Sequence, residues 1–212
     1  GDVKKNALVI LKDVLSETKS IRFEGNNYSD EWKKEAKKRK LFIVDTTPEA
    51  LQYNLNKECV ALFESMNVLS KRELESRVEI KLDAYSNTKL VEFRLAVDMV
   101  RRQIMPAILS QLSSLGSVYT SGKELKLNCV GIQNDFRVLE EVYSKLQTKV
   151  DYFNKYIEST DSLDDSYKKA YEAATKGVDL LQSLRDDVDL AESLIAKDNW
   201  PLPTYDELLL SI

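Results

Sequence analysis

Apolar residues recur every three or four positions through most of this chain, which is the spacing that gathers them on one face of an α-helix. The pattern predicts helices over about residues 3–17, 70–115, 124–159 and 164–197. Its apolar positions are Ala7, Leu8, Leu11, Val14 and Leu15, then Leu74, Val78, Leu82, Tyr85, Ala96, Val100, Ile104 and Ile108, then Leu139, Val142, Tyr143, Leu146 and Val150, and last Ala170, Ala173, Ala174, Val178, Leu181 and Leu184.

Local signals set the ends of the long segments. Ser70 and Glu73 have the spacing of a capping box, which indicates a helix start. We expect Pro106 to kink the helix that follows or to remove one of its hydrogen bonds. Breaks are predicted at the sequence SSLGS (113–117) and at Asp161–Ser162. Short connections between long helices favour antiparallel neighbours, so we predict a mostly α fold with a bundle of about three long helices.

The first quarter of the chain reads differently. Ile21 and Phe23 suggest a short strand, and residues 25–27, Gly-Asn-Asn, suggest a turn that tolerates left-handed backbone angles. Ser29 is positioned to cap a short basic helix that begins at Asp30. A further helix is expected from the Thr-Thr-Pro sequence at 46–48 to about residue 64. We therefore predict a small helical region with a short strand ahead of the bundle.

Composition narrows the class of protein. The 212 residues carry a net charge of −4, which argues against a nucleic-acid partner because such proteins need a basic surface. No apolar run approaches the roughly 20 residues of a membrane span, so no membrane partner is expected. Cys59 and Cys129 form no metal or disulfide pattern and favour a reducing cytoplasm as the location. The start at Gly1 without methionine suggests a piece of a longer protein.

The sequence contains no recognisable catalytic pattern. It has no histidine, which removes Glu-x-x-His di-iron sites, Ser-His-Asp triads and histidine zinc sites. No glycine-rich phosphate loop is present. The acids at 164–165 and at 186, 187 and 189 could be read as a cation site, but neighbours on a helix point in different directions, so a solvated face is favoured. We assign no catalytic, cofactor-binding or metal residue.

Two clusters leave alternatives open. Glu24, Asn26, Asn27 and Tyr28 could form a ligand loop, but we favour a turn in which Tyr28 and Trp32 anchor the short helix. Arg101 and Arg102 could clamp an anion, but pairing with acids on a neighbouring helix is the commoner fate of such residues.

The chain closes with an apolar tail, NWPLPTYDELLLS, over residues 199–211. Thr204 and Glu207 have capping-box spacing for a terminal helical turn. Its expected docking surface comprises Trp200, Leu202, Tyr205, Leu208 and Leu209. We predict that this tail is a clasp that docks on the bundle, on a catalytic core or on a neighbouring subunit.

Five segments together resemble the type III glutamine synthetases. They read IRFEGNNYSDEWKKEAKKR, TTPEAL, ALFESMNVLSKRELESRVEIKLDAYSNTKLVE, DMVRRQIMPA and WPLPTYDELL, in the order and at spacings compatible with that family. The resemblance implies that residues 1–87 are the end of a catalytic domain and residues 88–212 a C-terminal helical extension specific to type III. No residue matches a catalytic motif of the family, so none is carried over.

The resemblance also implies a parent activity. The parent would form glutamine from glutamate and ammonia with ATP, through a γ-glutamyl phosphate, using magnesium or manganese in a large ring-shaped homo-oligomer. This piece would be non-catalytic, with the rest of the synthetase chain as its partner, and its role would be packing and assembly. The alternative is a free-standing helical scaffold or adaptor without an enzyme parent.

Overall fold

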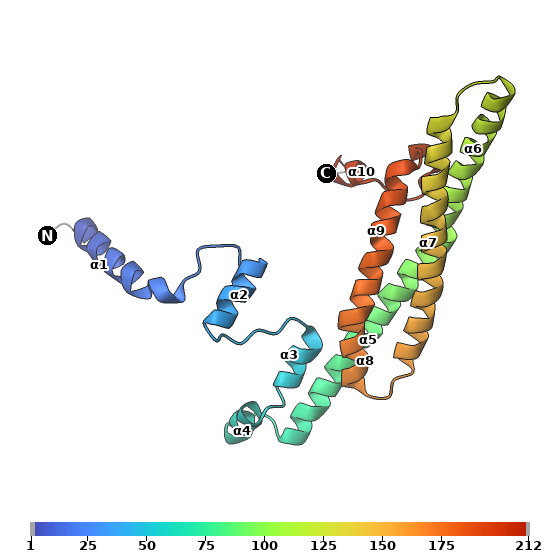
Figure 1. The fold of residues 1–212 in the computed structure, drawn as a ribbon. Coiled ribbons are helices and arrows are strands. Elements are labelled where there is room, and N and C mark those ends of the chain that lie inside the picture. Colours follow the sequence, from blue (N-terminus) through green and yellow to red (C-terminus); the bar gives the residue numbers. More distant parts are fainter. Residues whose placement is uncertain (1–2, 211–212) are drawn as a thin grey trace. The chain divides into compact units, whose positions relative to one another are not determined.

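The structure is a computed structural model that describes residues 3–210, and these residues fold into helices joined by short turns (Figure 1). The chain forms two compact units, one up to Asp45 and one from Thr46 onward. The mostly helical fold expected from the apolar spacing is confirmed. The predicted domain boundary at residue 87 lies within a continuous helix. The assignment of residues 1–87 to a catalytic domain and of residues 88–212 to a helical extension stays a prediction.

The first unit contains α1 (Val3–Glu17), the 3-10 helix η1 (Thr18–Ile21) and α2 (Asp30–Lys38). Ser29 caps α2 as expected, since its side chain accepts a hydrogen bond from the Trp32 amide. The short strand expected at Ile21 and Phe23 is not seen: Ile21 ends η1, and residues 3–210 contain no strand that could pair with this segment. A strand needs a hydrogen-bonding neighbour, and the described chain offers none.

Two short helices follow where one was expected. They are α3 (Thr47–Tyr53), capped by Thr46, and α4 (Lys57–Ser65). Asn56 separates them because its side-chain oxygen accepts a hydrogen bond from the Cys59 amide at 2.7 Å and starts a new helix. The prediction of one helix up to residue 64 is therefore wrong at this point.

The longest helical run begins at the predicted capping box and continues through three segments without a break. They are α5 (Lys71–Met99), the π-helical turn η2 (Val100–Ile104) and α6 (Met105–Glu124). In η2 the Met105 amide donates to the carbonyl oxygen of Val100, five residues back. The π-helical turn ends two residues before Pro106, which has no amide hydrogen to donate, so the expected disturbance of the helical hydrogen bonds takes this form.

The break after this run lies at residues 125–129 and not at SSLGS, which stays helical. Lys126 adopts a left-handed backbone with φ 55°, and the Leu127 amide donates to the Gly122 carbonyl oxygen at 2.9 Å. These features form a helix C-terminal motif, in which backbone amides beyond the helix donate hydrogen bonds to carbonyl groups that have no other partner at the end of α6. The prediction failed because a lysine, instead of a glycine, takes the left-handed position.

The remaining helices complete the bundle. They are α7 (Val130–Asp161), α8 (Ser166–Glu172), the π-helical turn η3 (Ala173–Gly177), α9 (Val178–Leu194), the 3-10 helix η4 (Lys197–Asn199) and α10 (Tyr205–Leu210). The predicted break at Asp161–Ser162 is confirmed. Figure 1 shows α7 and α9 alongside the α5–η2–α6 run, so three long helical rods form the predicted bundle.

One apolar core joins the three rods. It includes Phe93, Ile104 and Ile108 from the first rod, Leu146 and Phe153 from α7, and Leu184 from α9, all at most 2% exposed. A smaller cluster of Val78, Leu82 and Ala170 joins α5 to α8, with Leu51 of α3 against it. Val178 was expected to face inward in the last predicted helix, but it is 39% exposed, because Gly177 beside it takes the inward position.

The described helices also bear on membrane insertion. Among residues 3–210, no helix has both the length and the apolar character that crossing a bilayer requires.

Candidate functional site

Arg101 and Arg102, the candidate anion clamp, are each paired with an acid. An Nη atom of Arg101 lies 2.7 Å from a carboxylate oxygen of Asp151 on α7, and an Nη atom of Arg102 lies 3.6 Å from Asp98 on its own helix. The Gln147 amide and Arg101 both donate hydrogen bonds to Asp151 and lower the pKa of its carboxyl group. The expected pairing with acids is confirmed, with one partner on a neighbouring helix and one on the same helix.

The acids considered as a cation site serve local structure. Asp165 caps α8 by accepting a hydrogen bond from the Lys168 amide at 2.6 Å. Asp187 lies 2.6 Å from Lys149 of α7, and Asp189 lies 3.5 Å from Arg185. Within residues 3–210 no three cysteine, aspartate or glutamate side chains gather as a metal-binding group would require.

The candidate ligand loop is a structural turn. The Tyr28 amide donates to the Asn26 side-chain oxygen at 2.9 Å, and the Phe23 and Trp32 rings pack with centroids 4.8 Å apart. A Cβ atom on Gly25 would come within 2.7 Å of the Phe23 ring, so glycine makes room for this contact. Trp32 anchors α2 as expected, but Tyr28 is 96% exposed and does not. The turn tolerates left-handed backbone angles at residues 25–27, but none of these residues adopts one.

The C-terminal segment docks on the bundle through Trp200, which is only 8% exposed and belongs to the main core. Gln111 of α6 holds the turn that precedes it. The Gln111 side-chain oxygen accepts hydrogen bonds from the Ala196 amide at 3.3 Å and from the Asn199 side chain at 3.0 Å. The clasp predicted for the tail is therefore seen at its first residues.

The end of the segment is capped but only lightly packed. The Thr204 amide donates to the Glu207 carboxylate at 3.0 Å, and the Glu207 amide donates back to the Thr204 hydroxyl at 3.4 Å, so the predicted capping box is present. These contacts and Lys197 lower the pKa of Glu207. Leu202 packs on the core, but Leu208 and Leu209 are 57% and 71% exposed. The predicted docking surface thus covers less of the tail than expected, and the side chain of Tyr205 lies outside what the structure describes.

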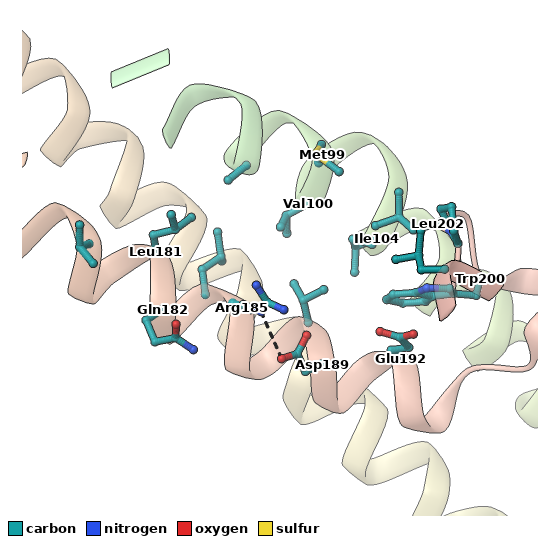
Figure 2. A pocket seen from close by; sticks show the side chains of 16 residues that line it. Met99, Val100, Ile104, Leu181, Gln182, Arg185, Asp189, Glu192, Trp200 and Leu202 are labelled. Carbon is teal, nitrogen blue, oxygen red and sulfur yellow. Dashed lines mark ion pairs between the residues drawn. The ribbon is translucent and has the colours of Figure 1, made fainter. Parts of the chain in front are cut away.

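Trp200 closes one end of an apolar groove between α9 and the η2 region, with a cavity volume of about 550 Å³ (Figure 2). Aliphatic side chains form most of its wall, among them Val100 and Ile104 from η2 and Leu181, Leu184 and Val188 from α9. Gln182, Arg185, Asp189 and Glu192 of α9 provide its polar groups. Figure 2 labels Glu192 and Trp200 among the side chains that line the groove.

The side chain of Trp200 carries one unusual polar atom. The indole nitrogen Nε1 of Trp200 is shielded from solvent and has no hydrogen-bond acceptor among the described residues. Most buried N–H groups are paired, so this unpaired one is an exception among the described residues. Trp200 was predicted correctly as a docking residue, but the groove could not be predicted, because it depends on where α9 meets η2.

Comparison with known families identifies the chain. The family model described as the glutamine synthetase C-terminal domain matches residues 6–123, more than half of the 212 residues. The chain belongs to this family. The predicted resemblance is thus confirmed.

Individual glutamine synthetases are similar over nearly the whole chain. The type-3 glutamine synthetase of Dictyostelium discoideum is 29% identical over 94% of this chain and 28% of its own length. The glutamine synthetase of Bacteroides fragilis (strain YCH46) is 27% identical over 95% of the chain and 28% of its own length, and that of Butyrivibrio fibrisolvens is 28% identical over 100% of the chain and 30% of its own length. The chain therefore spans less than a third of the relatives that it matches.

Proposed function

We propose that this C-terminal domain is a non-catalytic part of a type III glutamine synthetase, which packs on the catalytic portion of its parent chain and supports assembly of a homo-oligomer. The parent reaction is the ATP-dependent amidation of glutamate by ammonia, with ATP and magnesium or manganese bound upstream of this domain. In this proposal residues 1–87 complete the catalytic domain, residues 88–212 are the type III helical extension, and the parent is cytoplasmic.

The apolar face of α1 is the observation that carries the proposal. Leu8, Leu11 and Leu15 fall on one side of the helix, yet they are 64%, 53% and 42% exposed. An amphipathic helix gains its stability mainly by burying such a stripe against a partner. The stripe therefore favours a surface on the rest of the parent chain, and the family membership makes a free-standing scaffold the weaker alternative.

A second apolar surface suits a role in assembly. It lies at the α6–α7 connection, where Val118, Leu125, Leu127 and Val130 are each between 54% and 71% exposed. Exposed apolar groups of this kind are typical of contact surfaces between proteins. We propose that this end of the bundle meets a neighbouring subunit.

The role of α1 can be tested in the full-length parent protein with a matched pair of variants. Leu11→Asp puts a charge on the apolar stripe, and Lys12→Asp changes the next residue, which is also exposed. We expect L11D to lower both the assembled fraction in sedimentation velocity and glutamine formation at least tenfold, because it buries an unpaired charge. K12D should stay close to wild type. Normal assembly and activity of L11D would contradict the proposed packing.

The proposed lack of catalytic activity has its own test. The purified 212-residue chain should release no phosphate from ATP in a glutamate-dependent way, whereas the full-length protein should. Phosphate release by the chain alone would overturn the non-catalytic assignment. Light scattering should also show self-association of the chain as its concentration rises, since the apolar stripe of α1 is exposed.

A further inference from the structure

We propose that the outer end of the α6–α7 pair docks on the same region of a second copy of the chain, so that the two copies form a four-helix bundle. We name this region, residues 113–138, the tip hairpin. The inference rests on the proposed role in assembly and identifies the surface that the neighbouring subunit contributes. The third rod is shorter than the other two, since α9 ends at Leu194 and Figure 1 shows α6 and α7 extending past that end.

The apolar face that α6 turns toward the third rod continues beyond the end of that rod. Ile104 lies against α9, and the Gln111 side-chain oxygen accepts hydrogen bonds from the turn that follows α9. Val118 and Leu125 follow Gln111 at seven-residue intervals, close to two helical turns each, so they lie on the same side of α6. Val118 is 54% and Leu125 is 71% exposed, whereas Ile104 is fully buried. No described residue therefore takes the place of α9 beside them.

The same change occurs along α7. Lys149 marks the side of α7 that faces α9, because its Nζ atom lies 2.6 Å from a carboxylate oxygen of Asp187. Val142 and Val138 precede Lys149 by seven and eleven residues, which places both near that side of the helix. Val142 is 1% exposed, but Val138 is 41% exposed. Both helices of the tip hairpin thus carry an apolar strip on one side, and two helices need further helices to enclose such strips in a core.

The charges at the two ends of the tip hairpin favour a second copy as the partner. A two-fold axis across the hairpin places the outer end of one copy beside the base of the other. The outer end carries Lys126, and Glu141 at the base borders the strip because it follows Val138 by three residues. Both are exposed, and neither forms an ion pair within residues 3–210. A partner with one sign of charge would be repelled at one end, whereas a second copy matches both ends.

Sedimentation equilibrium of the intact 212-residue chain measures this pairing, with Leu11→Asp in every sample to remove association through α1. We expect a monomer–dimer equilibrium. Val118→Asp should raise the dimer dissociation constant at least tenfold, because it buries an unpaired charge. Ser113→Asp is the matched control, since Ser113 is exposed on a different side of α6 and should leave the constant unchanged. A monomer at every concentration, or equal dimerisation of V118D, would overturn the proposal. The α1 packing is judged separately, by L11D in the full-length parent.

An exchange of charges tests the antiparallel arrangement of the two hairpins. Lys126→Glu places like charges opposite each other at both symmetric contacts, so it should weaken the dimer about tenfold, and Glu141→Lys should do the same. The double variant K126E/E141K restores opposite charges across each contact and should return to within about threefold of the parent L11D chain. Circular dichroism should be unchanged in all three variants, because both positions are exposed. A double variant that dimerises no better than either single variant would reject the proposed pairing of outer end with base.

Discussion

Gly177 lies against the Cε2–Cζ edge of the Phe93 ring, so closely that a Cβ atom on it would stand 2.6 Å from Cε2 and 2.8 Å from Cζ of Phe93. Gly177 is the last residue of η3, and Phe93 is a fully buried residue of α5 whose ring also packs on Phe153 of α7, with centroids 5.2 Å apart. All three helical rods therefore meet at one point. The close approach of η3 to α5 depends on the missing side chain at residue 177.

Gly177→Ala should destabilise the protein, although alanine is the better helix former by about 1 kcal/mol. Phe93 is held by Phe153 and cannot move aside freely, so the added methyl group overpacks the core at a cost of about 1–3 kcal/mol. We expect a lower urea midpoint for G177A with an unchanged slope. Phe93→Leu in the same chain should recover part of the loss.

Gly116→Ala is the matched control for this substitution. Gly116 also lies within a helix, but a Cβ atom there would meet only Cε2 of Phe136 at 3.8 Å, an ordinary contact. G116A should therefore stabilise the protein by up to about 1 kcal/mol. A stabilising effect of both substitutions would show that the Phe93 contact yields without cost.

Trp200→Ala should cost about 3–5 kcal/mol, the usual range for removing a buried aromatic side chain from a core. The same change at Leu209, which is 71% exposed, should stay within about 0.5 kcal/mol. Chemical denaturation followed by far-ultraviolet circular dichroism measures both. Similar losses for the two variants would mean that the tail docks along its whole length and not through Trp200 alone.

Arg101→Ala should raise the pKa of Asp151 toward its ordinary value, because the substitution removes both a hydrogen bond and a positive charge from that carboxylate. Gln147→Ala should act in the same direction, since the Gln147 amide also donates to Asp151. Carbon-detected NMR titration of Asp151 reports the shift. Arg102→Ala, in a residue that pairs with Asp98 instead, should leave the pKa of Asp151 nearly unchanged.

The ends of the helices show how much of this fold could be predicted. Capping boxes at Ser70–Glu73 and Thr204–Glu207 are local patterns, and both form as expected. The break at residues 125–129 was not predicted, because Lys126 adopts the left-handed backbone angle there and the segment contains no glycine or proline to indicate the end of a helix. Short-range sequence patterns were therefore sufficient at these two capping boxes and insufficient at the end of α6.

Long-range contacts account for what the sequence did not reveal. The inward position of Gly177 depends on Phe93, a residue more than eighty positions earlier in the chain. The groove depends likewise on α9 lying beside η2, and neither helix carries a motif that marks it. Trp200 was recognised as a docking residue from its apolar ring, but its unpaired nitrogen is a property of its surroundings alone.

Tyr156 should make the stability of the bundle fall at alkaline pH. Its hydroxyl donates to the Glu172 carbonyl oxygen at 2.8 Å, and burial, reinforced by the charge of Glu172, raises the pKa of Tyr156 to about 12. An unfolded chain ionises tyrosine near pH 10. The contribution of Tyr156 is therefore complete below about pH 10 and is lost as the pH rises toward 12, because ionisation favours the unfolded chain.

Tyr156→Phe separates this effect from the titration of other groups. At neutral pH the variant should be less stable by about 1 kcal/mol, the usual value of one hydrogen bond. The difference between wild type and variant should shrink between pH 10 and 12, since the wild type alone carries this ionisable group at position 156. Tyr152→Phe is the control, because Lys176 lies over both rings but Tyr152 is 50% exposed. A difference that stays constant up to pH 12 would show that Tyr156 ionises equally well in the folded and unfolded chain.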